Sequence, residues 1–282
     1  MRAAYAKVNL WLNVVGRRAD GYHLLDSLVA FVDLSDTVEA RPHDRLSLEV
    51  TGPEGVALAG EADNLVLKAA RLLADRAGVP ARASLSLAKR IPVAAGLGGG
   101  SADAAATLRA LADLWRLALP EDALFEIAGA LGADVPMCLA GRTALASGIG
   151  DRLEPVPPLP SAAILLVNPR VALLTREVFA ARRGPFSAAR PLPPRWRDGA
   201  ELVAALAERG NDLADAAMSL QPVVAEVLDV LRHSADVRYA AMTGSGATCF
   251  ALYDTLAAAR RAAASVPEGW WRHAGELVST PA

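Results

Sequence analysis

The stretch IPVAAGLGGGSADAAATLRALADLW, residues 91–115, joins a glycine-dense loop to an alanine-rich run of helical period. This period predicts a helix from Ser101 to about Leu117. The start of a helix exposes unpaired N–H groups and a partial positive charge, and glycines let those amides approach a ligand without interference from a Cβ atom. We therefore expect an anion site, most often one for phosphate, in which Ser101 caps the helix and donates to a phosphate oxygen. Lys89 and Arg90 are expected to add positive charge, and the alternative is a plain tight turn.

The loop does not follow the familiar phosphate-binding templates. The Walker pattern GxxxxGK[ST] needs a lysine after its last glycine, but residues 96–101 read GLGGGS. The dinucleotide pattern GxGxxG needs glycine at position 101 and finds Ser101, and the protein-kinase signatures HRD and DFG are absent from the sequence. Four glycines in five residues, followed by a serine and a strong helix, still favour a phosphate cradle of another type.

Composition and charge argue against several classes of protein. The 282 residues include 29 Lys and Arg against 31 Asp and Glu, a formal net charge of −2, which disfavours bulk electrostatic binding to nucleic acid or to an anionic membrane. The two cysteines lie far apart without a CxxC or Cys/His cluster, so neither a disulfide framework nor a zinc site is expected. No segment suits a signal peptide or a bilayer span. We expect a cytoplasmic protein without nucleic-acid or membrane partners.

Hydrophobic periodicity predicts strands and helices that interleave irregularly. Residues 5–15 predict a strand, with apolar residues at even positions and Lys7, Asn9 and Trp11 at odd positions. Further strands are predicted at 46–50, 83–91, 162–169 and on both sides of a glycine turn within 239–254; helices are predicted at 62–78, capped by Asp63, and at 120–132, 199–210, 221–234 and 256–267. Residues 151–160 suggest a linker and residues 182–199 a long loop. Two α+β domains, residues 1–154 and 155–282, are therefore expected.

The segment from Pro92 to Ala104 resembles the second motif of the GHMP small-molecule kinases, broadly P-x-x-x-G-L-[GS]-[GS]-[GS]-[SA]. An N-terminal strand with Lys7 and Asn9, and a C-terminal glycine turn in TGSGATCF, residues 243–250, lie where that family has its other features. The resemblance covers nearly the whole chain. It implies an N-terminal domain like domain 2 of ribosomal protein S5, a C-terminal ferredoxin-like domain, and a cleft between them where ATP meets an acceptor alcohol.

The resemblance also implies the residues that bind ATP. These are Lys89, Pro92, Gly96, Leu97, Gly98, Gly99, Gly100, Ser101 and Ala102. No protein cage of carboxylates for a metal is visible, so Mg²⁺ is expected to arrive with ATP and to keep several waters. Many relatives have a second serine where this chain has Ala102. We expect a modest effect, because backbone amides do most of the cradling.

The implied catalytic residues are Asp134, in LGADVP, and Lys7. Phosphoryl transfer mostly needs positioning and charge neutralisation, and a base to accept the hydroxyl proton helps. By resemblance, Asp134 is that base. Lys7 pairs with it, keeps it ionised and holds the transferring phosphate, while Asn9 orients the acceptor hydroxyl. From the residues alone, Asp134 could instead cap a turn, and Lys7 could face solvent.

Three segments, RRADGYHLLDSL from Arg17, LGADVP and GIGDRLEP from Gly148, are similar to the branch of the family that phosphorylates the C2 hydroxyl of a cytidine-diphosphate-linked methylerythritol in the non-mevalonate route to isoprenoid precursors. A flat base needs an aromatic face and hydrogen bonds at its edge. The resemblance therefore assigns substrate binding, besides Asn9, to Tyr22 (stacking), His23 (reading the edge), Phe179 (a second stacking aromatic), Thr175, Gly244 and Ser245. The alternatives are that His23 is a turn residue, Phe179 is helix core and the glycine turn is an ordinary hairpin.

Three rival functions remain open at this point. A sibling kinase would act on mevalonate, homoserine or galactose, but the Tyr22–His23 pair favours a cytidyl acceptor. A non-catalytic family member would bind a ligand only, and it would be free to lose Asp134. An RNA-binding protein is suggested only by the S5-like fold, and the net charge of −2 disfavours it. A monomer or a homodimer is expected.

Overall fold

The computed structural model describes residues 1–58 and 64–278, and in these residues eleven strands join in one sheet. The longest strand, β3 (His23–Arg41), connects the sheet. It pairs antiparallel with β1 (Arg2–Asn9), β2 (Asn13–Arg17), β5 (Ser84–Ala88), β6 (Ala144–Gly148) and β11 (Trp271–Val278). Two short strands extend the edges, β4 (Ser47–Thr51) parallel to β5 and β7 (Arg152–Pro155) antiparallel to β6.

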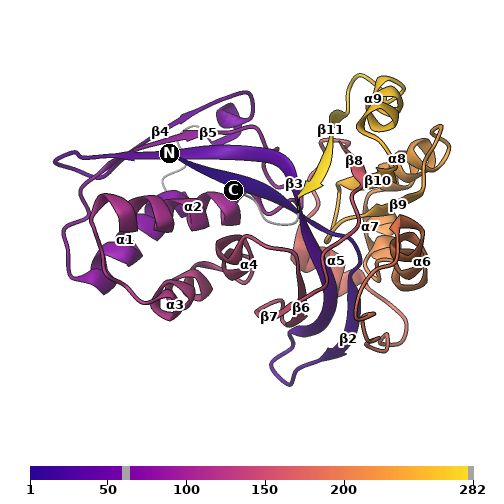
Figure 1. The fold of residues 1–282 in the computed structure, drawn as a ribbon, viewed down its shortest axis with the longest axis horizontal. Helices are drawn as coiled ribbons and strands as arrows, with labels where there is room; N and C mark the ends of the chain where they lie inside the picture. The colour runs from indigo at the N-terminus through magenta and orange to yellow at the C-terminus, as the bar shows by residue number, and fades with distance from the viewer. Residues whose placement is uncertain (59–63, 279–282) are drawn as a thin grey trace.

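In the N-terminal half, on the left of Figure 1, helices pack against this sheet, except α3 (Glu121–Leu131), which packs on the other helices. The other helices are α1 (Leu65–Ala77), α2 (Gly99–Leu114) and α4 (Val135–Ala140), and a 3₁₀ turn, η1 (Gly55–Leu58), follows β4. Helix α2 is central, because its buried alanines let it approach α1, β1 and β3 closely. The sheet and the N-terminal helices therefore hold the start of α2 rigidly in place.

The C-terminal half continues the same sheet through β11, which lies beside both β3 and β8 (Figure 1). Strand β8 (Ala163–Asn168) is wholly buried, and it pairs with β10 (Cys249–Tyr253), which pairs with β9 (Tyr239–Met242). One face packs on α8 (Val223–Arg232) and α9 (Leu256–Ala264), with α5 (Thr175–Ala181) and α7 (Ala214–Leu220) in the same core. On the other face, α6 (Gly199–Arg209) packs with Trp11 and Phe250. The mixed helices and sheet confirm the predicted α+β class.

Several predicted boundaries are correct and others are wrong. Helix α1 ends at Gly78, which adopts the left-handed conformation expected of a C-cap, but its N-cap is Asn64, and Asp63 lies outside the described residues. The predicted strand at 5–15 is interrupted, since β1 ends and β2 begins four residues later. Part of the predicted linker at 151–160 is strand β7. The predicted division at residue 154 stays a prediction, and the sheet continues across it through β11.

The predicted start of the helix after the glycine loop is also wrong. Helix α2 begins at Gly99, and its N-cap is Gly98, which has no side chain with which to cap the helix. Ser101 therefore lies within the first turn and is not the cap. The first hydrogen bond of the helix runs from the Ala102 N–H to the Gly98 carbonyl, so the amides before Ala102 are those that a helix start leaves for a ligand.

Candidate functional site

The glycine loop, residues 92–98, and the start of α2 form one wall of a cavity of ≈ 350 Å³. The cavity is lined by Leu58, Asn64, Leu65, Lys89, Pro92, Val93, Ala94, Ala95, Gly96, Leu97, Gly98, Gly99, Gly100, Ser101 and Asp103. Every residue predicted to bind ATP is in this lining except Ala102. That side chain is buried in the hydrophobic core beneath β1, so a second serine here would not simply add a hydroxyl to the cavity wall.

Two loop positions require glycine because of close approach as well as backbone conformation. Gly96 and Gly98 have φ values of 75° and 67°, in the left-handed region. A Cβ atom at Gly96 would lie 2.7 Å from the Gly246 carbonyl oxygen, and one at Gly98 would lie 2.7 Å from Cγ of Lys7. The loop thus packs directly on β1 and on the C-terminal glycine turn, which brings three separate parts of the sequence to one place.

Lys7 and Asp134 lie together at this point. The Lys7 Nζ atom donates to Asn9 Oδ1 at 2.8 Å and lies 3.4 Å from Asp134 Oδ2. The Lys7 side chain is 8% exposed and that of Asp134 is 51% exposed, so the cation is enclosed while the carboxylate stays accessible. The alternative in which Lys7 faces solvent is wrong. Asp134 is the N-cap residue of α4, and its side chain makes no capping hydrogen bond there.

Asn9 is held in one orientation by buried partners. Its Nδ2 atom donates to Ser27 Oγ at 2.7 Å, and the Ser27 hydroxyl donates to the Trp11 carbonyl. Its backbone N–H donates to Thr243 Oγ1 at 2.7 Å. These contacts turn the amide oxygen of Asn9 toward Lys7. Its contact with an acceptor hydroxyl stays a prediction, and Ser27 was missed because a serine inside an apolar strand carries no signal of its own.

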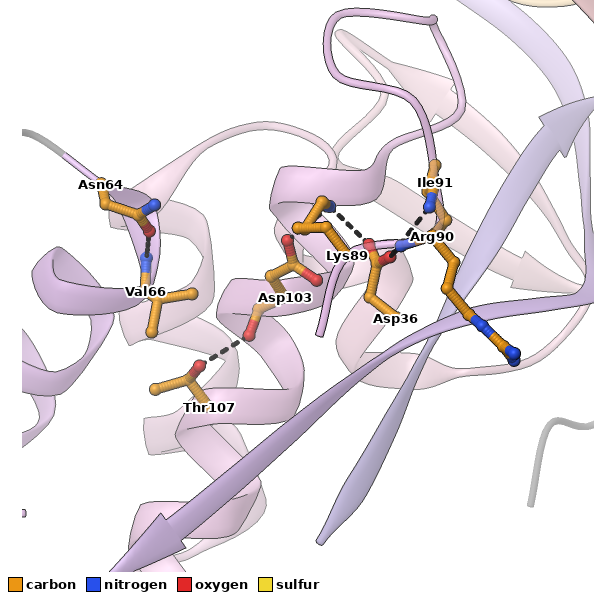
Figure 2. A network of polar contacts seen from close by, with 8 residues as sticks. All are labelled: Asp36, Asn64, Val66, Lys89, Arg90, Ile91, Asp103 and Thr107. Carbon is orange, nitrogen blue, oxygen red and sulfur yellow. Dashed lines mark hydrogen bonds and ion pairs between the residues drawn. The ribbon is translucent and has the colours of Figure 1, made fainter. Parts of the chain in front are cut away.

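Lys89 has a different environment from the one predicted. Its Nζ atom donates to Asp36 Oδ2 and to Asp103 Oδ2, the latter at 2.8 Å, and all three side chains are almost fully buried (Figure 2). The other oxygen of Asp36 accepts from the backbone N–H groups of Arg90 and Ile91. Arg90 does not line the cavity, and Figure 2 shows its guanidinium pointing away from the Lys89 ammonium. The cluster therefore anchors the chain just before the glycine loop.

The charges in this cluster are unequal. Burial works to lower the pKa of Lys89, but the carboxylates of Asp103 and Asp36 outweigh it and raise that pKa. Burial raises the pKa of Asp103 to about 7; Lys89 opposes this rise, and the charge of Asp36 adds to it. Asp103 Oδ1 is buried without a hydrogen-bond partner in the described residues, although Asp103 lines the cavity. One cation thus serves two carboxylates, and one carboxylate oxygen has no hydrogen-bond partner in the described residues.

The predicted acceptor-binding residues form two contacts. The rings of His23 and Phe179 stack with centroids 5.0 Å apart and an interplanar angle of 24°. Thr175 and Ser245 share a hydrogen bond of 2.9 Å between their hydroxyls. Both contacts join α5 to a distant part of the chain. Tyr22 is 61% exposed, and its contact with a base stays a prediction.

The surroundings of His23 favour its neutral form. Burial lowers the pKa of His23, and the charges of Arg17 and Arg182 lower it further. A neutral imidazole has one donor nitrogen and one acceptor nitrogen. It can therefore present either role to the edge of a base at neutral pH.

The C-terminal glycine turn, residues 243–248, is longer than a tight two-residue hairpin, because β9 ends at Met242 and β10 begins at Cys249. The Asn211 Nδ2 group donates to the carbonyls of Met242 and Gly244 and so holds the turn. A Cβ atom at Gly244 would lie 3.4 Å from both Asn9 Oδ1 and the Gly96 carbonyl oxygen. The turn therefore packs on the glycine loop and on Asn9.

In residues 1–58 and 64–278, no helix combines the length and the apolar character that a bilayer span needs. Within the same residues, no three His, Cys, Asp or Glu side chains gather in a group that could hold a metal ion.

Comparison with known proteins identifies similar chains over the full length. The family model described as "GHMP kinases N terminal domain" matches residues 64–142, and that described as "GHMP kinases C terminal" matches residues 194–270. The chain is 52% identical over 285 residues to the 4-diphosphocytidyl-2-C-methyl-D-erythritol kinase of Rhodospirillum rubrum, covering 100% of this chain and 94% of that protein. It is 53% identical over 279 residues to the protein of the same name from Paramagnetospirillum magneticum, covering 98% of each.

A solved structure extends this similarity to three dimensions. The crystal structure of a 4-(cytidine 5'-diphospho)-2C-methyl-D-erythritol kinase matches with a TM-score of 0.80 at 37% identity, and the match covers 98% of both chains. The likeness therefore includes both halves of the molecule and the sheet that joins them, and it is not limited to the glycine loop.

Proposed function

The chain belongs to the GHMP kinase family, and on that premise we propose that it transfers the γ-phosphoryl group of ATP to the C2 hydroxyl of 4-diphosphocytidyl-2-C-methyl-D-erythritol, a step of the non-mevalonate route to isoprenoid precursors. The observation that carries the proposal is the enclosed Lys7 beside the accessible Asp134, directly against the glycine loop. Relatives named 4-diphosphocytidyl-2-C-methyl-D-erythritol kinase, which are similar over the whole chain, support this acceptor.

ATP would bind in the cavity at the start of α2. The backbone amides before Ala102 and the positive end of the helix would hold its phosphates, and Leu58 and Leu65 give the cavity an apolar part. The absence of a Cβ atom at Gly96 and Gly98 keeps that backbone close to Lys7 and the C-terminal turn. Lys89 would contribute by fixing the loop, since its ammonium is already paired.

Mg²⁺ fits this cavity as a partner of ATP, where it would neutralise phosphate charge. Asp103 lines the cavity, its Oδ1 atom has no hydrogen-bond partner in the described residues, and a carboxylate oxygen is the type of donor that Mg²⁺ prefers. Since the described residues offer no cluster of three acidic or imidazole ligands, the ion would keep most of its waters.

Asp134 would accept the proton of the acceptor hydroxyl. Its exposed carboxylate can reach a substrate, and the Lys7 ammonium lies 3.4 Å from it. A carboxylate is a weak base, but the loose transition state of phosphoryl transfer needs little proton removal. Lys7 would in turn stabilise negative charge on the transferring group, because it is enclosed and only partly neutralised.

The cytidyl end of the acceptor would lie at the His23–Phe179 pair. Tyr22 would supply a stacking face, neutral His23 would read the edge of the base, and the hydroxyls of Thr175 and Ser245 would contact polar groups of the acceptor. Gly244 would allow close approach of the acceptor phosphates. A cytoplasmic location, supported by two free cysteines, and a monomer or homodimer complete the proposal.

Acceptor specificity tests the proposal directly. Purified protein with Mg²⁺ and ATP is offered 4-diphosphocytidyl-2-C-methyl-D-erythritol, mevalonate, homoserine or galactose, and ADP release is measured. We expect turnover with the cytidyl acceptor alone and its collapse in Asp134→Asn. Turnover on another alcohol would support kinase activity but contradict the assignment of Tyr22, His23 and Phe179 to a cytidyl group. ATP binding without turnover on any acceptor would favour a non-catalytic family member.

A further inference from the structure

An ion pair outside the cavity joins two distant segments of the chain. Arg170 donates two hydrogen bonds to Glu54, from Nη1 to Oε2 at 3.2 Å and from Nη2 to Oε1 at 2.8 Å. Glu54 lies between β4 and η1, and Arg170 follows β8. The Glu54 side chain is mostly buried, and the Arg170 side chain is half-exposed. Neither residue lines the cavity, so the pair would not touch the nucleotide.

A continuous chain of hydrogen bonds leads from Arg170 to the glycine loop. The Arg170 N–H donates to Asn168 Oδ1 at 2.7 Å, and Asn168 Nδ2 donates to Thr248 Oγ1 at 2.8 Å. The Thr248 hydroxyl then donates to the Ala95 carbonyl. Asn168 and Thr248 are buried, so their hydrogen bonds leave few alternative arrangements. Ala95 follows Ala94, which has a φ of 55° although it is not glycine. The loop conformation is therefore imposed by its surroundings.

The Glu54 end of the pair also reaches the cavity. The Glu54 N–H donates to the Lys89 carbonyl at 3.2 Å, and Lys89 belongs to the buried cluster that precedes the loop. After Glu54 the chain forms η1, and Leu58 at its end lines the cavity. The ion pair is thus tied to both ends of the segment that holds the loop, through Lys89 on one side and Ala95 on the other.

Arg170 itself adopts an uncommon backbone conformation. Its φ is 58°, in the left-handed region that favours glycine. Non-glycine residues persist there where the surroundings hold them, and such positions concentrate at functional sites. Here Asn168 Oδ1 holds the Arg170 N–H, and Glu54 holds the guanidinium. Since an arginine stands where glycine would be less strained, its side chain is the feature to explain.

We propose that Arg170 and Glu54 are positioning residues that hold residues 94–98 in the conformation that binds the phosphates of the nucleotide. This inference rests on the proposed function for the identity of the ligand, ATP, but not for the acceptor. The pair acts through Asn168 and Thr248 on the Ala95 carbonyl, and through Lys89 on the start of the loop. A bidentate guanidinium–carboxylate contact fixes geometry as well as charge, which is what a distant support of a loop requires.

The test is nucleotide affinity measured without acceptor. Isothermal titration calorimetry with ADP, and with a non-hydrolysable ATP analogue and Mg²⁺, is applied to the full chain and to Arg170→Gln, Glu54→Gln and the double variant. We expect each single change to weaken nucleotide binding about five- to tenfold. The double variant should be no weaker than the singles, because the two residues act as one contact. In turnover, KM for ATP should rise while kcat and the KM for the acceptor change less than about twofold.

Two further variants separate positioning from simple stability. Arg170→Gly suits the left-handed backbone and should fold at least as well as the parent, yet it should weaken nucleotide binding as Arg170→Gln does. Arg238→Gln is the matched control, since Arg238 forms a comparable two-nitrogen contact with Asp254 on the exposed surface, away from the cavity. It should leave affinity unchanged.

Unchanged nucleotide affinity in Arg170→Gly and Glu54→Gln would overturn the inference, as would equal weakening in Arg238→Gln. Additive losses in the double variant would also overturn it, because they would mean independent effects. Failure of the acceptor assignment would leave these binding measurements intact, so the two proposals can fail separately.

Discussion

Two buried lysines lie against Gly98 and Gly99, where the glycine loop meets α2, and they differ in how their charge is balanced. A Cβ atom at Gly98 would lie 2.7 Å from Lys7 Cγ, and one at Gly99 would lie 3.2 Å from Lys89 Nζ. Lys89 bonds to two carboxylates that are as buried as itself. Lys7 has one amide oxygen and one half-exposed carboxylate, at 3.4 Å.

This difference indicates that Lys89 supports the structure, whereas Lys7 takes part in the chemistry. A buried charge is tolerated only when it is paired, and removal of one partner leaves the other uncompensated. The pairing of Lys89 is complete within the fold, so its charge has little left to offer a ligand. The pairing of Lys7 is loose and opens toward solvent through Asp134, so its charge can act on a phosphate that enters.

The largest expected effect is on turnover, at the Lys7 region. Lys7→Met and Asp134→Asn should each lower kcat by about 10³-fold, because they remove charge stabilisation or the base. Thermal unfolding should show little loss of stability, because the remaining partner in each variant is either exposed or still bonded to Asn9. A loss of activity below tenfold in both variants would remove the basis of the comparison.

The next effect is on stability, at the Lys89 region. Lys89→Met leaves Asp36 and Asp103 buried and close together without a cation, so the free energy of unfolding should fall by about 3 kcal/mol. Urea unfolding measures it. Arg41→Met, which removes an exposed cation paired with Glu39, is the control and should change stability by less than about 1 kcal/mol. If Lys89→Met lowers the free energy of unfolding as little as Arg41→Met does, Lys89 does not have the structural role inferred here.

The sequence predicted one of these lysines better than the other. Lys7 and Asp134 were identified because family motifs contain them, and the structure brings them together. The partners of Lys89 could not be found in this way, because Asp36 lies 53 residues away in β3 and Asp103 lies within α2. Strand β3 itself was not predicted: residues 26–32 are all buried, so the alternation that signals a strand is lost in that part of it.

Other features depend on tertiary contacts alone. The start of α2 at Gly99 was missed because Ser101 is a better cap by residue type, whereas Gly98 is required by its left-handed backbone and by Lys7. The Arg170–Glu54 pair joins residues 116 positions apart, and nothing local in either segment predicts it. The helices with clear caps, such as α1 with Gly78, were predicted well.

The Asp103 carboxyl group should make the stability of the Lys89 region depend on pH. Its pKa is raised from 3.8 to about 7 by burial, against the attraction of Lys89 and with the repulsion of Asp36. Between these values the folded state holds a proton that the unfolded state has lost, so the free energy of unfolding falls as pH rises. Asp103→Asn removes this fall in the free energy of unfolding, because asparagine does not titrate. The stability of the variant relative to the parent should therefore increase by about 2 kcal/mol from pH 5 to pH 8.

Urea unfolding at several pH values checks this prediction. Asp113→Asn is the matched control, because Asp113 lies on the same helix as Asp103 but is exposed, where it pairs with Arg2. The difference in the free energy of unfolding between this variant and the parent should stay nearly constant with pH. A difference between Asp103→Asn and the parent that does not change with pH would mean that Lys89 keeps both carboxylates ionised across the range.

The smallest expected effect comes from one methyl group placed against Lys7. Gly98→Ala forces alanine into the left-handed region, which costs about 1–2 kcal/mol, and its Cβ atom must displace Lys7 from the position 2.7 Å away. We expect kcat to fall about tenfold, because a small displacement of a positioned cation weakens its action. Gly129→Ala in α3 is the control: no neighbouring atom lies within 4 Å of the added methyl, so stability should rise by about 0.5–1 kcal/mol without loss of activity. Loss of stability in Gly98→Ala with full activity would show that Lys7 tolerates displacement, and its loose pairing would then reflect mobility and not a fixed catalytic position.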